Sequence, residues 1–287
     1  MLSVQQYTDC KRQRKWHFAP ARGHEMNNDG SKELHIGLND HVALIEIDRP
    51  PNNHITLPLV QALAEALEQL DNEPECRAIV LAARGRHFCA GADLVNRAPG
   101  ASVPRDERTG RSLYTEALRL LRTRKPIIAA VHGAAIGAGL CLAVVADFRV
   151  TCSQARFSAN FTRLGFHPGF GLTALLPQLI GKQQASLLFY TGRRITGDEA
   201  VAMGLADVLV PEAEVRSAAM ALATEIAESA PLAVMGVRET MRRGLAEAYE
   251  AATEREFSEQ AWQRQTEDYS EGIAAMKDRR KPKFTGH

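Results

Sequence analysis

The stretch Lys125–Arg149 constrains the fold most strongly, because it combines a long uncharged run with a dense cluster of small residues. An apolar run of about 20 residues can span a bilayer, and Gly133 and Gly137 have the small-xxx-small spacing of packed transmembrane helices. A third glycine at position 139 would, however, weaken a single helix. Ile127 to Val131 is a short run with β-branched residues after a proline, which is typical of a buried strand. We therefore expect a strand, a glycine turn and a helix.

The glycine turn also predicts a chemical capacity. A turn that leads into a helix presents backbone N–H groups without partners at the positive end of the helix dipole. Such groups can bind an anionic oxygen. We therefore expect an oxyanion site where the helix begins.

Composition is typical of a soluble globular protein that binds small molecules. The 287 residues, 45% apolar and 24% charged, suffice for one well-buried domain with a helical appendage. The 35 Lys and Arg residues nearly balance the 34 Asp and Glu residues, so charge gives no argument for a nucleic-acid or membrane partner. Five cysteines without a C-x-x-C pair argue against a disulfide framework or a zinc site. We expect a cytoplasmic protein without a metal.

Local patterns divide the chain into three parts. Residues 1–32 contain a basic run, a polar tract and few aliphatic residues, which predicts a disordered N-terminal tail. Residues 33–211 follow the order β-β-α-β-α-β-α, which indicates an α/β core of parallel strands joined by crossover helices. Residues 212–287 are predicted to be helical, with a break at Pro231 and apolar residues at helical spacing at Met241, Leu245, Ala248 and Phe257.

Three motifs resemble those of one known family. The stretch from His132 to Arg149 follows x-G-x-[AC]-x-G-[GA]-G-x-x-[LI]-[AS]-x-x-x-D-x-R, Phe88 to Leu94 follows F-[CS]-[AS]-G-A-D-[LI], and Thr191 to Pro211 is similar to T-G-x-x-[IL]-x-A-x-E-A-x-x-[MWL]-G-L-V-x-x-[VI]-x-P. These patterns resemble the crotonase (enoyl-CoA hydratase/isomerase) superfamily. The resemblance implies the crotonase (ClpP/crotonase-like) α/β spiral of repeated β-β-α units with a C-terminal helical region. It also implies a homotrimer or a dimer of trimers.

The resemblance further implies where an acyl-CoA ligand binds. In the family, the backbone N–H groups at the positions of Ala92 and Ala138 form the oxyanion hole for the thioester carbonyl and stabilise an enolate. Only backbone is used, so alanine at 138 is compatible with this role. Contacts with CoA are implied for Ala90, Asp93, Leu94 and His54, and for Met276 and Arg279 toward a neighbouring protomer. No cofactor is expected, since the CoA thioester is itself substrate or ligand.

Both glutamates of the family are replaced in this chain. Hydration of an α,β double bond needs one carboxyl group to activate water and another to manage the α-carbon proton, each contributing about 10²–10⁴-fold. Residue-by-residue matching puts these positions at Cys141 and Phe161. Gly169 stands where hydrolase, dienoyl-isomerase and dehalogenase members carry an aspartate, which disfavours those activities. Three possibilities stay open: a hydratase/isomerase-like enzyme without the two-glutamate mechanism, a catalytically silent acyl-CoA carrier, and a C–C hydrolase that uses histidine.

Other side chains are candidates for proton transfer. His167 is the favoured acid/base, because the ordinary pKa of histidine suits proton transfer near neutrality. Cys141 near a helix N-terminus could have a lowered pKa, although a small buried cysteine usually serves packing. His132 is expected to support the turn, and Asp93 and Asp147 to serve local structure.

Overall fold

The computed structural model describes residues 24–25, 33–94, 96 and 103–287. The disordered tail predicted for residues 1–32 therefore lies outside the described residues, except at His24–Glu25. These two residues form strand β1 at the edge of a sheet. The division of the chain at residues 32 and 211 stays a prediction.

The described strands form one large and one small sheet. The large sheet has the order β1-β2-β3-β4-β5-β7-β10 and the small one the order β6-β8-β9. β2 and β3 pair antiparallel, whereas β3, β4, β5, β7 and β10 run parallel, as the sequence pattern predicts. The bounds are β2 Leu34–Asn39, β3 Val42–Ile47, β4 Ala78–Ala83, β5 Ile127–Val131, β6 Ala134–Ile136, β7 Phe148–Thr151, β8 Arg156–Ser158, β9 Arg194–Thr196 and β10 Val208–Leu209.

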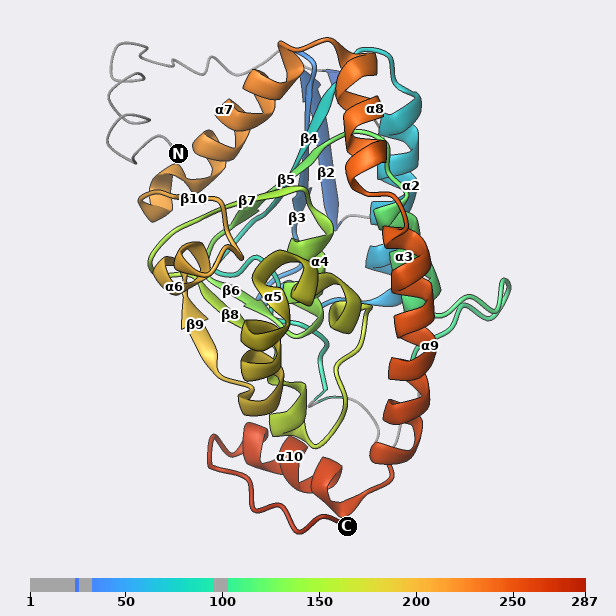
Figure 1. Cartoon of the computed structure of the whole chain (residues 1–287), viewed down its shortest axis with the longest axis vertical. Helices are drawn as coiled ribbons and strands as arrows, with labels where there is room; N and C mark the ends of the chain where they lie inside the picture. Colours follow the sequence, from blue (N-terminus) through green and yellow to red (C-terminus); the bar gives the residue numbers. More distant parts are fainter. Residues whose placement is uncertain (1–23, 26–32, 95, 97–102) are drawn as a thin grey trace.

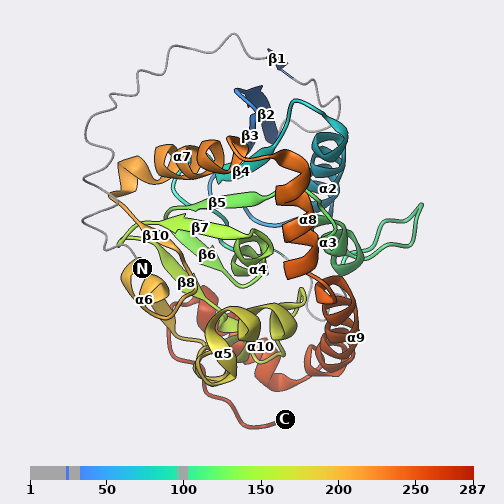
Figure 2. The same ribbon diagram turned by 45° about the horizontal axis from the view of Figure 1, so that its top comes forward.

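Helices cover both faces of the large sheet. Helix α7 crosses one face, and α2 and α3 lie on the opposite side (Figures 1 and 2). Every residue of β4 and β5 is buried, as expected for parallel strands between helical layers. The bounds are α2 Leu57–Asn72, α3 Leu113–Leu121, α4 Ala138–Val145, α5 Leu172–Thr191, α6 Gly197–Ala202, α7 Val215–Ala227, α8 Pro231–Met241, α9 Leu245–Gln263, α10 Glu267–Lys277, and the 3₁₀ turns η1 Asn160–Leu164 and η2 Glu212–Glu214.

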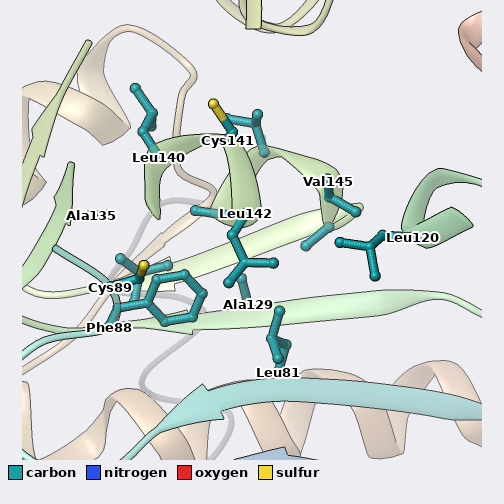
Figure 3. Packing of buried hydrophobic residues seen from close by; sticks show 14 of the residues in the cluster. Leu81, Phe88, Cys89, Leu120, Ala129, Ala135, Leu140, Cys141, Leu142 and Val145 are labelled. Carbon is teal, nitrogen blue, oxygen red and sulfur yellow. The ribbon is translucent and has the colours of Figure 1, made fainter. Parts of the chain in front are cut away.

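The stretch 125–149 has the predicted strand, turn and helix. β5 ends at Val131, Gly133 turns the chain, and the short strand β6 precedes α4. Figure 3 shows Leu142 of α4 pointing toward Leu81 and Ala129 of the sheet, while Cys141 points to the opposite side. Among the described residues, no single helix is long and apolar enough to cross a membrane. One pair bent by 107°, Glu212–Ala227 with Pro231–Met241, has the required length and composition.

A buried ion pair fastens the helical region to the core. Asp147, just before β7, accepts hydrogen bonds from Arg238 Nε at 2.9 Å and Arg242 Nη1 at 2.8 Å. The Ile127 N–H also donates to Asp147, at 2.8 Å. Burial alone would raise the pKa of Asp147, but the guanidinium groups of Arg238 and Arg242 lower it. Asp147 therefore has the structural role expected of it, and joins the start of β5 to α8.

A second buried carboxylate attaches α9 to α5. The N-cap of α5 is Gly171, which has no side chain to bind the first amides. Glu256 of α9 accepts from the N–H groups of Gly171 at 2.7 Å and Thr173 at 3.0 Å, and from the Thr173 hydroxyl at 2.6 Å. Its side chain is buried. Burial raises the pKa of Glu256 to about 7, although these hydrogen bonds oppose the shift.

Asp147→Asn should destabilise the protein by about 3–5 kcal/mol, because it leaves two guanidinium groups buried without their counter-charge. In urea unfolding, this loss of stability appears as a lower urea concentration at the midpoint of the transition. Asp278→Asn is the matched control, since that side chain is exposed at the end of α10, and its effect should stay within about 0.5 kcal/mol. Equal effects of the two substitutions would contradict the role given to Asp147.

The raised pKa of Glu256 predicts a pH dependence of stability. As pH rises from about 4.5 to 7, the unfolded chain releases the proton first, so the folded state is progressively disfavoured. The wild type should therefore lose up to about 3 kcal/mol relative to Glu256→Gln, which cannot titrate there. Unfolding free energies of both proteins at pH 4.5, 6, 7 and 8 test this. A difference that does not change with pH would show that the folded-state pKa is not raised.

Candidate active site

A small cavity of about 80 Å³ is lined by residues of two glycine turns, at Gly91 after β4 and at Gly137 after β6. Among the described residues that line it, none carries a carboxylate, imidazole or thiol. The lining residues are Ala90, Gly91, Ala92, Leu94, Val103, Pro104, Leu113, Tyr114, Ile136, Gly137, Ala138, Asn160, Phe161, Leu164, Phe166, Gly169, Phe170, Arg264 and Met276.

The backbone brings Ala92 and Ala138 to this one cavity. The Cys89 N–H donates to the Ala134 carbonyl at 2.9 Å, and the Ile136 N–H donates back to the Cys89 carbonyl at 3.1 Å. Gly91 has a φ of +88°, and a Cβ there would lie 2.6 Å from the Ile136 carbonyl oxygen, so only glycine permits this approach. Ala138 is the first residue of α4, where an amide has no partner inside the helix.

Cys141 is buried, and it is not among the described residues that line the cavity. Its sulfur lies 3.3 Å and 3.4 Å from the carbonyl oxygens of Gly137 and Gly169, to which the thiol can donate. Burial raises the pKa of Cys141 well above its ordinary value, and the nearby charge of Glu256 raises it further. The hypothesis of a lowered pKa is therefore wrong, and Cys141 packs as a neutral thiol.

Phe161, at the second glutamate position, forms part of the cavity wall and is 7% exposed. Its ring contacts the ring of Phe166 edge to face, with 5.6 Å between the centroids. The preceding residue, Asn160, also lines the cavity, and its Oδ1 would lie 3.4 Å from a Cβ on Gly137. The position at which the resemblance implies a carboxylate is therefore an aromatic surface.

The structure does not bring His167 to the cavity. His167 lines a separate groove of about 920 Å³ with residues of α5 and with Trp262 and Gln263. Its Nδ1 lies 2.8 Å from the Pro168 carbonyl oxygen. The acid/base role predicted for His167 stays a prediction, without support from this placement. His132 lies 2.9 Å from the Gly85 carbonyl oxygen through Nε2, and so supports the turn as expected.

The residues implied in CoA binding form two groups, one from positions 54–94 and one from the C-terminal end of the chain. Ala90 and Leu94 line it directly. His54 Nδ1 donates to the Gly91 carbonyl at 3.0 Å and its Nε2 accepts from Asn52 Nδ2 at 3.3 Å, so the ring supports the loop. Asp93 accepts from the Asn96 N–H at 3.2 Å and the Asn96 side chain at 2.7 Å.

Met276 and Arg279 belong to the second group. Met276, from α10, lines the cavity of its own chain, and its contact with a neighbouring protomer stays a prediction. Arg279 lies in an adjoining groove of about 820 Å³, which shares Asn160, Leu164 and Met276 with the cavity. The other basic residues of this groove are Arg163, Arg193, Arg194, Arg280 and Lys281.

A buried polar cluster next to the cavity was not predicted from the sequence. The Tyr114 hydroxyl donates to Gln260 Oε1 at 2.9 Å, and Arg264 Nη2 donates to the same oxygen at 2.8 Å. The fully buried residues of α9 are therefore Tyr249, Glu256 and Gln260, all of them polar. Met241, which the apolar pattern was expected to include, is the last residue of α8 and is 79% exposed. The sequence contains one signal for this polar face: the spacing of 7, 4 and 4 residues between Tyr249, Glu256, Gln260 and Arg264 is helical.

Comparison with known proteins gives the relatives of this chain. Residues 37–287 match the family described as enoyl-CoA hydratase/isomerase. A probable enoyl-CoA hydratase of Bacillus subtilis (strain 168) is 33% identical over 259 residues, which cover 88% of this chain and 98% of the relative. A probable enoyl-CoA hydratase of Mycobacterium tuberculosis (strain ATCC 25618 / H37Rv) is 34% identical over 251 residues, 85% of this chain and 97% of the relative.

Solved structures agree with these relatives. The enoyl-CoA hydratase/isomerase of Pseudoalteromonas atlantica T6c has a TM-score of 0.79 at 30% identity and covers 88% of this chain and 100% of its own. The carnitinyl-CoA hydratase of Mycobacterium avium has a TM-score of 0.78 at 31% identity and covers 90% and 100%. The chain therefore belongs to the enoyl-CoA hydratase/isomerase family and has the crotonase fold.

Proposed function

We propose that this protein binds an acyl-CoA thioester with the carbonyl oxygen between the N–H groups of Ala92 and Ala138. The supporting observation is that two separate glycine turns bring both residues to one cavity. Amide donors placed in this way stabilise the charge that develops on the oxygen as an enolate forms. Because the α4 amides are at the positive end of the helix dipole, α4 adds to this stabilisation.

The CoA moiety would extend from the cavity into the adjoining basic groove. This groove continues from the cavity at Asn160 and Met276, and it is lined by Arg163, Arg194 and Arg279. Guanidinium groups form strong charge-assisted hydrogen bonds with phosphates. The groove therefore suits the phosphates of CoA, and it contains Arg279, for which the resemblance implies a contact with the CoA of a neighbouring protomer.

Paired-carboxylate hydration is not part of the proposal. In the described lining of the cavity, the titratable side chains are Tyr114 and Arg264. Burial raises the pKa of Tyr114, so its hydroxyl stays protonated and can donate but cannot act as a base. Residues 95 and 97–102 contain no Asp, Glu, His or Cys. This lack of a base favours a second candidate function, acyl-CoA binding without turnover.

The proposal predicts slow hydration of crotonyl-CoA. The rate should be at least about 10²-fold below that of a family member with both glutamates, since one acid/base group contributes that much. Loss of the enoyl absorbance at high protein concentration measures it. Cys141→Glu or Phe161→Glu alone should restore little, because the two carboxyl groups act as a unit.

Rapid hydration by the wild type would overturn this part of the proposal. His167→Ala would then show whether that histidine transfers the proton. Calorimetry tests what the two candidate functions share, since both require binding of a CoA ester in preference to the free acid. Only the enzyme turns over one member of a panel of saturated and unsaturated acyl-CoAs.

Ala138→Pro tests the oxyanion hole directly. Proline is tolerated at the first position of a helix, so the substitution removes the N–H while preserving α4. Loss of one hydrogen bond of about 0.5–1.5 kcal/mol should weaken acyl-CoA binding about 2- to 10-fold. The affinity for free CoA, which has no carbonyl at this position, should not change.

Ala138→Ser is the matched control, because serine keeps the amide and should bind acyl-CoA as the wild type does. Unchanged acyl-CoA affinity in a folded Ala138→Pro protein would remove the amide of residue 138 from the proposed site. Circular dichroism and thermal unfolding verify that α4 and the fold are preserved.

A further inference from the structure

A histidine side chain links the two chain segments that carry Ala92 and Ala138. His87 follows β4 and lies five residues before Ala92. Its Nδ1 accepts a hydrogen bond from the N–H of Ala134 at 3.3 Å. Ala134 is the first residue of β6, and the chain continues from β6 into α4, which begins at Ala138. The imidazole therefore connects the loop of one proposed donor to the strand that leads to the other.

The ring of His87 takes the place of a backbone acceptor. The Cys89 N–H donates to the Ala134 carbonyl and the Ile136 N–H donates to the Cys89 carbonyl, which is the pattern of a parallel strand pair. Continued by one step, this pattern would pair the Ala134 N–H with the carbonyl of His87. That carbonyl accepts instead from Asn53 Nδ2 at 2.7 Å. Loss of the ring would therefore leave the Ala134 amide without its observed partner, which weakens the contact.

Gly133 leaves the space for this hydrogen bond. Its φ is +59°, and a Cβ there would overlap the Arg86 carbonyl oxygen and lie 3.0 Å from His87 Nδ1. Glycine is therefore the residue that permits the loop of His87 to approach the turn after β5. The half-buried ring is thus held by main-chain groups of both segments.

Only the neutral ring of His87 can accept this hydrogen bond. A neutral imidazole has one nitrogen that accepts, whereas both nitrogens carry a hydrogen in the protonated ring. The protonated ring would turn an N–H toward the N–H of Ala134, and the hydrogen bond would be lost. The neighbouring carbonyl oxygen of Arg86 favours the protonated form. Protonation therefore removes the contact with β6 and favours one inside the loop of His87 itself.

Burial and the surrounding charges keep the ring neutral near pH 7. Burial lowers the pKa of His87, and the guanidinium of Arg86 lowers it further. His132 after β5 and His54 before α2 act in the same direction when they are protonated. The ring of His87 therefore gains its proton only below the ordinary histidine pKa of about 6.5.

We infer that His87 is a positioning residue of the proposed thioester site, and that only its neutral imidazole holds the amides of Ala92 and Ala138 toward one carbonyl oxygen. The inference depends on the proposed binding of CoA thioesters. Hydrogen bonds weaken steeply when their geometry is poor, so an oxyanion hole needs donors at fixed positions. The contribution of the thioester carbonyl to binding should therefore decrease as the pH falls through the titration of His87.

Acetyl-CoA and S-ethyl-CoA test the inference, because the two ligands have the same length and differ in the carbonyl oxygen. Calorimetry from pH 7.5 to pH 5 gives the ratio of their dissociation constants, in which the titration of the CoA phosphates cancels. For the wild type, the preference for acetyl-CoA should decrease about 2- to 10-fold as the pH falls, as expected for the loss of one hydrogen bond. His87→Ala should show the reduced preference at every pH.

His87→Asn separates the titration from a merely structural role. Asparagine Oδ1 lies close to the position of imidazole Nδ1 and accepts a hydrogen bond without titrating. This variant should restore the preference that His87→Ala loses and keep it down to pH 5. His41→Asn is the matched control, because His41 Nδ1 lies 2.9 Å from the Glu75 carbonyl oxygen and His41 is outside the described lining of the cavity. It should keep the pH dependence of the wild type.

A wild-type preference that stays constant between pH 7.5 and pH 5 would overturn the inference and leave the proposed function intact. A pH dependence that persists in His87→Asn would assign the effect to another group, and so overturn the role of His87. Equal binding of acetyl-CoA and S-ethyl-CoA by the wild type at pH 7.5 would overturn the proposed function, and the inference with it. Circular dichroism at each pH verifies that the compared proteins are folded.

Discussion

The cavity depends on the close contact between two glycine turns. Two backbone hydrogen bonds between Cys89 and the Ala134–Ile136 strand hold the turns together. The contact is closer than a side chain allows, since a Cβ on Gly91 would meet the Ile136 carbonyl oxygen at 2.6 Å. The positions of the Ala92 and Ala138 amides are therefore set by main-chain geometry. Helices α3 and α9, the turn η1 and α10 complete the wall around this contact.

Features encoded in the backbone could be predicted from the sequence. Glycine spacing and apolar runs predicted β4, β5 and α4, and the motifs predicted that Ala92 and Ala138 would face one site. The polar cluster could not be predicted in this way, because Tyr114 and Gln260 are 146 residues apart in the chain. Local periodicity reports which residues are apolar, but a polar residue is buried only when a distant segment supplies its partner. That is why α9 has a buried polar face.

Cys141 and Phe161, which the resemblance matches to the two family glutamates, fit their surroundings. The thiol of Cys141 fits a buried site where the charge of Glu256 already raises its pKa, so a second carboxylate there would face both burial and a like charge. Phe161 is packed against Phe166, which in turn contacts Tyr269 with 5.5 Å between ring centroids. Each replacement is thus part of a packed environment. Several packing contacts, and not one substitution alone, therefore distinguish this cavity from a site that hydrates with paired carboxylates.

In the proposed function, polarisation of a carbonyl depends on main-chain amides, whereas transfer of a proton depends on side chains. The proposed donors, the amides of residues 92 and 138, belong to the main chain, so they do not depend on which side chains stand at 141 and 161. Binding that is equally strong in the ground state and the transition state does not raise the rate of the chemical step. Proton transfer would then require water or a group on the ligand. Tyr114 does not replace the missing base, because burial raises the pKa of its hydroxyl, which stays protonated and can only donate.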